Sequence, residues 1–417
     1  MEIVFTHCAG LDVHKKFLIA CLLIRDAQGT MHKQVRRFST MTQDLERLRA
    51  WLLAAECTHV VMESTGVYWQ PVYNILEGHL EVWLVNAQHV KYVPGRKTDL
   101  KDAEWLAQLM QRGLLRPSFI PPRQQRELRE VVRYRQQLIQ ERTRAANRLQ
   151  KVLEDANLKL TCVASDVQGV SAQAILRTLL AGQEDPAQLA QLARGQLQKK
   201  QAALAQALDG RVRPHHRFML AQLLSHLDFL DDQVWKLERQ IEARLKQLPG
   251  FAKAVERLDT IPGVGRQTAI LIVAEVGIDM TRFPSAKHLT AWAGLAPGQN
   301  ETGGKQRAAA TRKGNRYLRW GLTQAGQAAG RTKDTYLHAL YHRLAARRGK
   351  PRATLAVGRT ILEMAYYLLT RETTYTDLGA DYFDRQDREH ATQRMVHRLE
   401  ALGYTVTLTE PPLGTAA

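Results

Sequence analysis

Hydrophobic positions divide the chain into an N-terminal part with alternating strand and helix patterns and a remainder that is almost entirely helical. Apolar runs of strand length cover residues 3–12, 17–24, 33–38, 58–63 and 82–86. Helical spacing begins at Thr42 and recurs around residues 68–76 and from about Thr98 through Met110. The order β-β-β-α-β-α-β-α predicts an α/β sheet domain.

The middle of the chain predicts two long helices, over residues 123–155 and about 218–248. Their apolar positions repeat nearly every seven residues. In the first helix they are Leu128, Val131, Tyr134, Leu138, Ala145, Leu149 and Leu153, and in the second Leu223, Leu227, Leu230, Val234, Leu237, Ile241 and Leu245. A coiled-coil oligomerisation arm and an ordinary packed pair within one subunit explain this pattern equally well.

The remaining segments complete a division into four regions. Residues 163–215 are rich in Ala, Gln and Leu and predict a small helical insertion. Residues after 251 are helical and punctuated by glycine, and the tail after Arg371 predicts one amphipathic helix. We therefore expect a sheet domain over 1–120, a long-helix region over 121–250, a mainly helical domain over 251–371 and a tail over 372–417.

Charge changes the picture from fold to partner. The chain has 417 residues with 59 Lys and Arg against 41 Asp and Glu, a formal net charge of +18. Residues 301–370 alone hold 14 basic and three acidic residues, 14 − 3 = +11. This asymmetry favours a nucleic-acid partner. An anionic membrane surface would also attract the chain, but no apolar run approaches the ~20 residues of a spanning helix.

The cysteines and histidines indicate no site. The four cysteines lack the spacing of a zinc module or of a disulfide framework, which favours a reducing cytoplasm. We therefore expect a cytoplasmic protein without a membrane partner.

Four carboxylates occupy positions where a catalytic centre could form. Asp12 ends the first predicted strand and Glu63 the fourth, while Asp99 and Asp102 lie three residues apart at a helix start. Strand ends of an open α/β sheet share one crevice, and converging carboxylates need cations such as Mg²⁺ or Mn²⁺ between them. Two such ions support cleavage of a phosphodiester. Arg96 and Lys97 lie nearby in sequence and could hold phosphates.

Two glycine-containing segments predict nucleic-acid contacts in the second half. Gly263 and Gly265, followed by Arg266, resemble the turn of a helix-hairpin-helix element, which grips DNA through backbone N–H groups. The second segment has one hydroxyl at its glycine-rich centre, Thr302, which could serve as a nucleophile or simply belong to a phosphate-binding loop. The basic residues around it are Lys305, Arg307, Arg312, Lys313, Arg316 and Arg319.

These motifs together resemble the DEDD-type, RuvC-like transposases of the 110 family of bacterial insertion sequences. The resemblance covers residues 8–371 and rests on segments 10–15, 63–66 and 97–103 in the first half and on segments 261–265, 293–297 and 312–319 in the second. It implies an RNase H-like (RuvC-like) domain, a coiled-coil region and a mainly helical C-terminal transposase domain.

The resemblance also implies a mechanism. It implies two Mg²⁺ ions held by Asp12, Glu63, Asp99 and Asp102, DNA as substrate and a structured element-encoded RNA as guide. The long helices favour a homodimer or homotetramer, and we expect the protein to associate with the bacterial nucleoid. Family members place a serine, proposed to bond covalently to a DNA end, where this chain has Thr302. Two other hypotheses remain open at this point: a structure-selective nuclease that uses water, and a non-catalytic nucleic-acid-binding protein.

Overall fold

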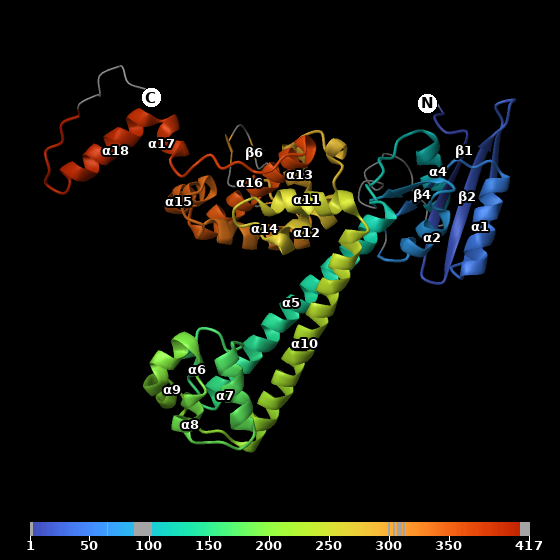
Figure 1. The fold of residues 1–417 in the computed structure, drawn as a ribbon. Coiled ribbons are helices and arrows are strands. Elements are labelled where there is room, and N and C mark those ends of the chain that lie inside the picture. The colour runs from blue at the N-terminus through green and yellow to red at the C-terminus, as the bar shows by residue number, and fades with distance from the viewer. Residues whose placement is uncertain are drawn as a thin grey trace. The chain divides into compact units, whose positions relative to one another are not determined.

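The chain divides into two compact units, residues 1–121 and residues 122–417. The computed structural model, drawn in Figure 1, describes residues 3–64, 66–86, 102–298, 301–302, 305–306, 311 and 313–408. Each unit has two apolar cores of its own, and each unit is described below by itself.

The first unit is a five-stranded mixed sheet of the RNase H-like class. Its strands are β1 (His7–Val13), β2 (Phe17–Arg25), β3 (Met31–Ser39), β4 (His59–Glu63) and β5 (Glu81–Val85), in the spatial order β3-β2-β1-β4-β5. Strand β2 runs antiparallel to β1 and β3, whereas β1, β4 and β5 are parallel to one another. This topology confirms the predicted fold class.

Helices cover both faces of this sheet. On one face, α1 (Thr42–Ala54) and α2 (Trp69–Leu76) bury leucines at helical spacing, including Leu45, Leu48 and Leu52, against the strands. On the other face, α4 (Asp102–Gln111) packs on β1, β2 and β4. The side chains of successive strand residues alternate between the two faces, so one strand supplies both cores.

The second unit begins with two long helices that pack against each other within the chain, α5 (Arg123–Asp155) and α10 (Pro214–Lys246). Most predicted stripe positions are buried. The prediction is wrong at Tyr134, because half of this side chain is exposed and Val132 is buried in its place. The reason is that α5 also packs on α12 (Arg266–Val276), which moves its buried face. Helix α10 begins four residues before the predicted start, at a proline suited to the first turn.

The segment between the long helices is a small helical subdomain. It consists of α6 (Leu160–Val163), α7 (Val170–Leu180), α8 (Pro186–Gln191), a 3-10 helix (Gly195–Lys200) and α9 (Gln201–Leu208). These helices share a core with the far halves of α5 and α10. Figure 1 shows them, in green, gathered at the end of the hairpin. The predicted insertion is therefore helical, and its short helices are held by the hairpin.

The C-terminal part is a helical bundle that holds the predicted nucleic-acid motifs. Its helices are α11 (Pro249–Asp259), α12, α13 (Ala286–Trp292), α14 (Arg316–Ala329), α15 (Tyr336–Arg348) and α16 (Lys350–Arg371). Two short strands, β6 (Glu301–Thr302) and β7 (Lys305–Gln306), pair antiparallel. The tail forms two helices, α17 (Tyr382–Gln386) and α18 (Arg388–Glu400), where the sequence predicted one.

None of the helices in the described segments has both the length and the apolar content that a membrane span requires.

Candidate active site and nucleic-acid interface

Asp12 and Glu63 lie at the ends of two adjacent parallel strands. Leu11 of β1 is paired with Met62 of β4, so Asp12 and Glu63 are the next residues along the two strands. Each lies one residue after a side chain of the α1–α2 face, and both therefore belong to the face covered by α4. Parallel pairing thus brings the two carboxylates to the same edge and the same face of the sheet.

Helix α4 brings Asp102 to this edge because it crosses β1 at a glycine. A Cβ atom on Gly10 would stand only 2.5 Å from the backbone nitrogen of Ala107 and 3.0 Å from Cβ of Leu106, and it would also clash with the carbonyl of Ala103. Only glycine permits this close approach. Asp102 immediately precedes Ala103 and is the first residue of α4, and Asp12 lies two residues beyond Gly10 on the same strand face.

The surroundings of these acids fit a hard divalent cation. Asp12 is 29% exposed and its Oδ2 lies 3.0 Å from Nε2 of His14. Glu104, two residues after Asp102, forms an ion pair with Lys33 on β3 at 3.0 Å. Its carboxylate is therefore paired with a lysine and is not counted among the metal ligands. Three half-buried carboxylates on one side of the sheet are the oxygen donors that Mg²⁺ or Mn²⁺ prefers. The fourth predicted acid, Asp99, lies outside the described residues, as do Arg96 and Lys97.

The three buried thiols of the first unit are structural. Burial raises the pKa of Cys8 and of Cys57 to about 12, and burial likewise raises the pKa of Cys21 to about 11. Thiols with such pKa values are not nucleophiles near neutral pH. Cys8 instead packs in the α4 face, with Sγ directed at the carbonyl of Ala107.

The second unit holds the predicted nucleophile and most of the predicted basic contacts. Thr302 lies in β6, and its backbone pairs antiparallel with that of Lys305 in β7. Lys313 and Arg316 are exposed, whereas Arg319 donates to Oγ1 of Thr311 at 2.8 Å. Arg307 and Arg312 lie outside the described residues.

The predicted helix-hairpin-helix turn lies between α11 and α12 and packs on α14. Gly263 has φ +83°, and a Cβ atom there would stand 2.5 Å from the backbone nitrogen of Ala329. Gly265 precedes α12 and has open space around the position of a Cβ atom. Arg266 donates to both carboxylate oxygens of Glu242, at 2.8 and 2.7 Å. Packing therefore explains Gly263, while DNA contact by Gly265 and Arg266 stays a prediction.

A buried ion-pair network that the sequence analysis missed anchors the start of α14. Glu275 on α12 is fully buried, and Arg133 of α5 donates to both of its carboxylate oxygens at 2.6 and 2.7 Å. Asn315, which caps α14 through the N–H groups of residues 317 and 318, also donates to Glu275 at 2.5 Å. Arg129 donates to the carbonyls of Ala274 and Glu275, and burial lowers its pKa to about 10.

A third close approach, at Gly314, joins two of the motifs that carry the resemblance. A Cβ atom on Gly314 would stand 2.5 Å from the carbonyl carbon of Ala293, so the segment before α14 packs directly on the turn after α13. The guanidinium groups of Arg133 and Arg316 each lie 4.8 Å from the centroid of the Tyr317 ring. The only sequence signal for Glu275 was its position as a lone charge in the apolar run 269–276.

Comparison with known proteins extends these observations. Residues 9–158 match the IS110 DEDD transposase family model, and residues 255–342 match the model described as the IS116/IS110/IS902 transposase family. The 43.6 kDa protein of insertion element IS110 from Streptomyces coelicolor is 31% identical over 308 residues, which are 68% of this chain and 73% of that protein. The chain belongs to the IS110 family of insertion-sequence transposases.

One further relative agrees with this assignment, and one solved structure is also similar to part of the chain. A probable family 20 transposase of Pseudomonas aeruginosa is 28% identical over 323 residues, covering 76% of this chain and 85% of the relative. The RuvC structure of Thermus thermophilus covers 27% of this chain and is itself covered to 99%, at 15% identity and a TM-score of 0.20. The matched family segments contain all the predicted acids and Thr302, and they leave out the whole helical insertion, residues 163–215.

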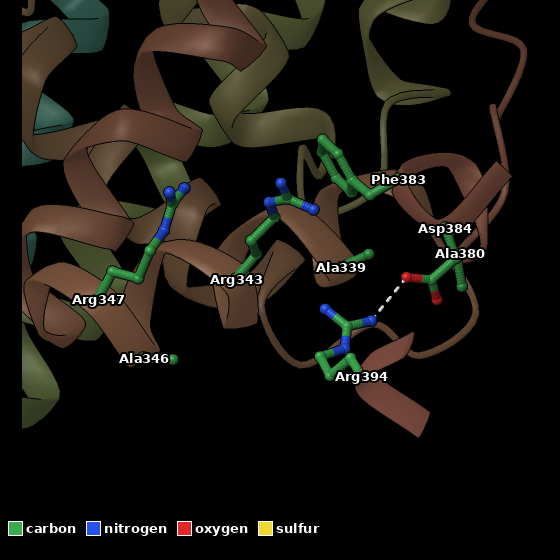
Figure 2. A pocket seen from close by; sticks show the side chains of 8 residues that line it. All are labelled: Ala339, Arg343, Ala346, Arg347, Ala380, Phe383, Asp384 and Arg394. Carbon is green, nitrogen blue, oxygen red and sulfur yellow. Dashed lines mark hydrogen bonds and ion pairs between the residues drawn. The ribbon is translucent and has the colours of Figure 1, made fainter. Parts of the chain in front are cut away.

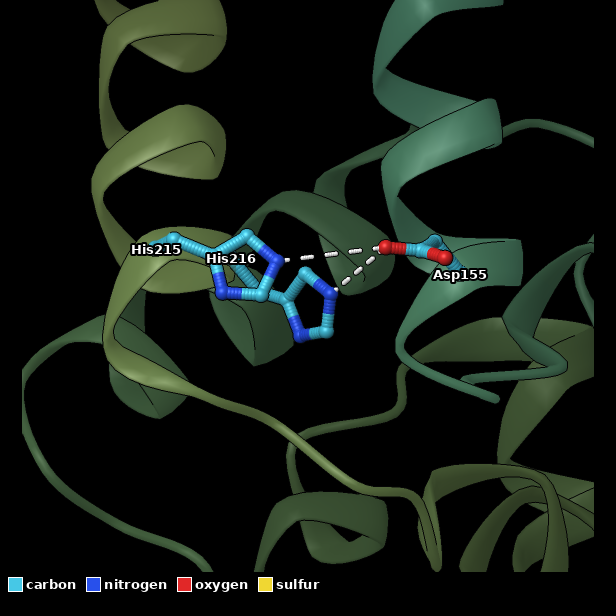
Figure 3. A group of neighbouring side chains, drawn as sticks. All are labelled: Asp155, His215 and His216. Atoms are coloured by element: carbon cyan, nitrogen blue, oxygen red, sulfur yellow. Dashed lines mark hydrogen bonds and ion pairs between the residues drawn. The ribbon is translucent and has the colours of Figure 1, made fainter.

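A second group of potential metal ligands in the transposase lies at the far end of the hairpin (Figure 3). Nε2 of His216 is 2.8 Å and Nε2 of His215 is 3.9 Å from Oδ2 of Asp155. Nδ1 of His216 accepts the N–H of Arg213 at 3.2 Å, so the ring proton resides on Nε2 and donates to Asp155. Both ring nitrogens of His216 are thus used to fasten the start of α10 to the end of α5, which makes this group structural.

Proposed function

We propose that the transposase cuts and rejoins DNA at a centre formed by Asp12, Glu63, Asp99 and Asp102, which hold two divalent metal ions. Mg²⁺ is the proposed ion, and Mn²⁺ can substitute for it. The observation that carries this proposal is the close packing of α4 on Gly10, which brings the helix start to the strand ends of Asp12 and Glu63. Metal ions bound there would neutralise the carboxylates and polarise the phosphodiester.

Thr302 of the second unit is the proposed nucleophile. Its Oγ attacks the phosphorus, so that an Oγ–P bond forms, the P–O3′ bond breaks and the hydroxyl proton ends on the released 3′ oxygen. The 3′ hydroxyl of the exchanged strand then attacks the same phosphorus, a new P–O3′ bond forms and Thr302 recovers its proton. Every phosphodiester that breaks is replaced by another, which fits a chain without a Walker-type phosphate-binding motif.

Basic residues of both units and two glycines of the second unit are proposed to hold the nucleic-acid backbone. In the first unit these are Arg96 and Lys97, and in the second they are Gly263, Gly265, Arg266, Lys305, Arg307, Arg312, Lys313, Arg316 and Arg319. A net charge of +18 supports contacts that follow the phosphates and carry no sequence information. We propose that a structured element-encoded RNA selects the DNA sequence, and that the chain works as a homodimer or homotetramer through its long hairpin.

A cleavage assay tests the proposal. A supercoiled plasmid carrying the joined element ends is incubated with Mg²⁺, with and without RNA transcribed from the flanking noncoding segment. Wild type is compared with Asp12→Asn and Thr302→Ala, and denatured products are probed for protein attached to DNA. Glu104→Gln is the matched control. It removes a carboxylate from the same helix as Asp102, and this carboxylate is already paired with Lys33.

Each outcome decides a separate part of the mechanism. A protein–DNA adduct that requires both Asp12 and Thr302 supports the recombinase with a threonine nucleophile. Cleavage without an adduct, lost in Asp12→Asn and retained in Thr302→Ala, would indicate a nuclease that uses water. No cleavage by wild type with either RNA condition contradicts the catalytic proposal, and equal products with and without RNA contradict the guide.

A further inference from the structure

A basic cavity lies between α15 and the two tail helices, away from every motif assigned above. Its volume is about 420 Å³, within the range of ligand pockets, about 300–1,000 Å³. Figure 2 shows three arginine side chains around it, Arg343 and Arg347 from α15 and Arg394 from α18. One carboxylate, that of Asp384, also lines the cavity, so its charge is 3 − 1 = +2.

One face of α15 is built to receive an anion. Ala339, Arg343, Ala346 and Arg347 are separated by four, three and one residues and therefore lie on the same side of the helix. The alanines leave space beside the helix, while the long arginine side chains supply planar groups of N–H donors. Among the residues that the structure describes, no carboxylate forms an ion pair with Arg343 or Arg347.

The tail closes the other side of the cavity. The Phe383 ring lies between Tyr336, with ring centroids 5.3 Å apart and planes at 25°, and the guanidinium of Arg343, 5.0 Å from its centroid. Arg394 donates to Oδ1 of Asp384 at 2.8 Å; the Arg394 side chain is 65% exposed and that of Asp384 44%. The Asp384 carboxylate thus occupies, inside the cavity, a position that the anionic group of a ligand could take.

We propose that this cavity binds a backbone phosphate of the nucleic acid on which the transposase acts. Arg343 and Arg347 donate to the phosphate oxygens, and Asp384 competes with the phosphate for Arg394. The inference rests on the proposed function, because it assumes that the chain binds DNA or RNA. A phosphodiester is the expected occupant because the surrounding stretch, residues 301–370, carries +11 and because guanidinium groups match phosphate geometry.

The test is a salt titration of binding with the full chain in the absence of divalent ions. Fluorescence anisotropy measures the affinity for a labelled duplex DNA, the corresponding DNA strand and the corresponding RNA strand. The Arg343→Gln/Arg347→Gln variant is compared with wild type and with Arg348→Gln. Arg348 is the matched control, because it is an exposed arginine of the same helix that does not line the cavity.

The expected loss has a size and a salt dependence. Each phosphate contact contributes about 0.9 to the slope of log affinity against log salt on duplex DNA and about 0.7 on a single strand. Loss of two contacts should lower the slope by up to about 1.8 on duplex DNA and by up to about 1.4 on a single strand. The affinity for duplex DNA near 0.1 M salt should fall by up to about 60-fold. If the slope and the affinity fall for the DNA probes, the phosphate belongs to DNA. If they fall for the RNA strand, the phosphate belongs to RNA.

Asp384→Asn supplies a test with the opposite sign. Removal of its charge frees Arg394, so affinity should rise, a result that a misfolded variant cannot produce. A slope for the double variant equal to that of wild type or of Arg348→Gln overturns the proposed site. Unchanged or lower affinity of Asp384→Asn overturns the competition for Arg394. Failure of wild type to bind any of the probes contradicts the proposed function itself, and this inference with it.

Discussion

The contact between Gly10 and α4 leads to a specific prediction. Replacing one hydrogen atom of Gly10 by a methyl group should change the geometry of the proposed metal centre. In Gly10→Ala, the new Cβ would stand 2.5 Å from the backbone nitrogen of Ala107. An ordinary contact of this kind needs about 3.5 Å, so α4 must move away from β1 by about 1 Å. Asp102 moves with the helix, whereas Asp12 stays on the strand.

Two magnitudes follow from this displacement. Overpacking of a close-packed interface costs about 1–3 kcal/mol in the free energy of unfolding. A misplacement of about 1 Å in a catalytic centre costs about 100-fold in rate. The expected result for Gly10→Ala is therefore a protein that still folds but cuts DNA about a hundred times more slowly. Urea denaturation measures the first quantity, and the initial rate of plasmid cleavage with saturating Mg²⁺ measures the second.

Cys8→Ala separates displacement from simple destabilisation. Cys8 lies two residues before Gly10 on the same strand face and also touches α4, through the carbonyl of Ala107. Its truncation removes volume, costs about 1 kcal/mol and does not push the helix away. This variant should retain nearly the wild-type rate. Equal rates for Gly10→Ala and Cys8→Ala at matched fractions of folded protein would refute the reasoning.

Three further predictions concern stability and reactivity. Glu275→Ala should lower the free energy of unfolding by about 3–5 kcal/mol, because buried guanidinium groups lose their carboxylate; a loss below about 1 kcal/mol in urea denaturation would contradict the buried pairing. A thiol reagent should modify only Cys162 in the folded chain, since burial raises the pKa of the other three thiols to about 11 or about 12; rapid modification of a second thiol argues against this. Arg266 holds the pKa of Glu242 below its ordinary value, so the pair stabilises the fold above pH ~4.3 and loses this effect as pH falls through the lowered pKa. The stability gap between wild type and Arg266→Gln should therefore narrow on acidification, and a constant gap would contradict the pairing.

The sheet and its carboxylates were predictable because their signals are local. Each strand is a short apolar run bounded by turn residues, and the alternation of strands and helices restricts the topology to few possibilities. Asp12 and Glu63 stand at strand ends, where parallel pairing brings them together without further information. Gly10 was part of the motif, but its role as the crossing point of α4 depends on a contact between residues about a hundred positions apart, which no periodicity encodes.

The ion-pair network on Glu275 could not be predicted for a similar reason. Arg133 precedes Glu275 by 142 residues, and many arginines on α5 would have satisfied a helical pattern equally well. The stripe on α5 failed at Tyr134 because a seven-residue repeat assumes one partner helix, whereas α5 meets α10 along its length and α12 near its start. The break between α17 and α18 falls in a polar stretch without proline or glycine and has no signal in the sequence.

The two cores that share α5 explain why the hairpin and the C-terminal bundle form one compact unit. Leu128 and Val132 belong to the core of the bundle, while Leu149 and Leu153 belong to the core at the far end of the hairpin. Rotation of the hairpin against the bundle would have to separate Arg133 from the fully buried Glu275, at a cost of about 3–5 kcal/mol. The same carboxylate holds Asn315, the cap of α14. The position of the hairpin and that of the basic segment at the start of α14 are therefore set by one buried charge.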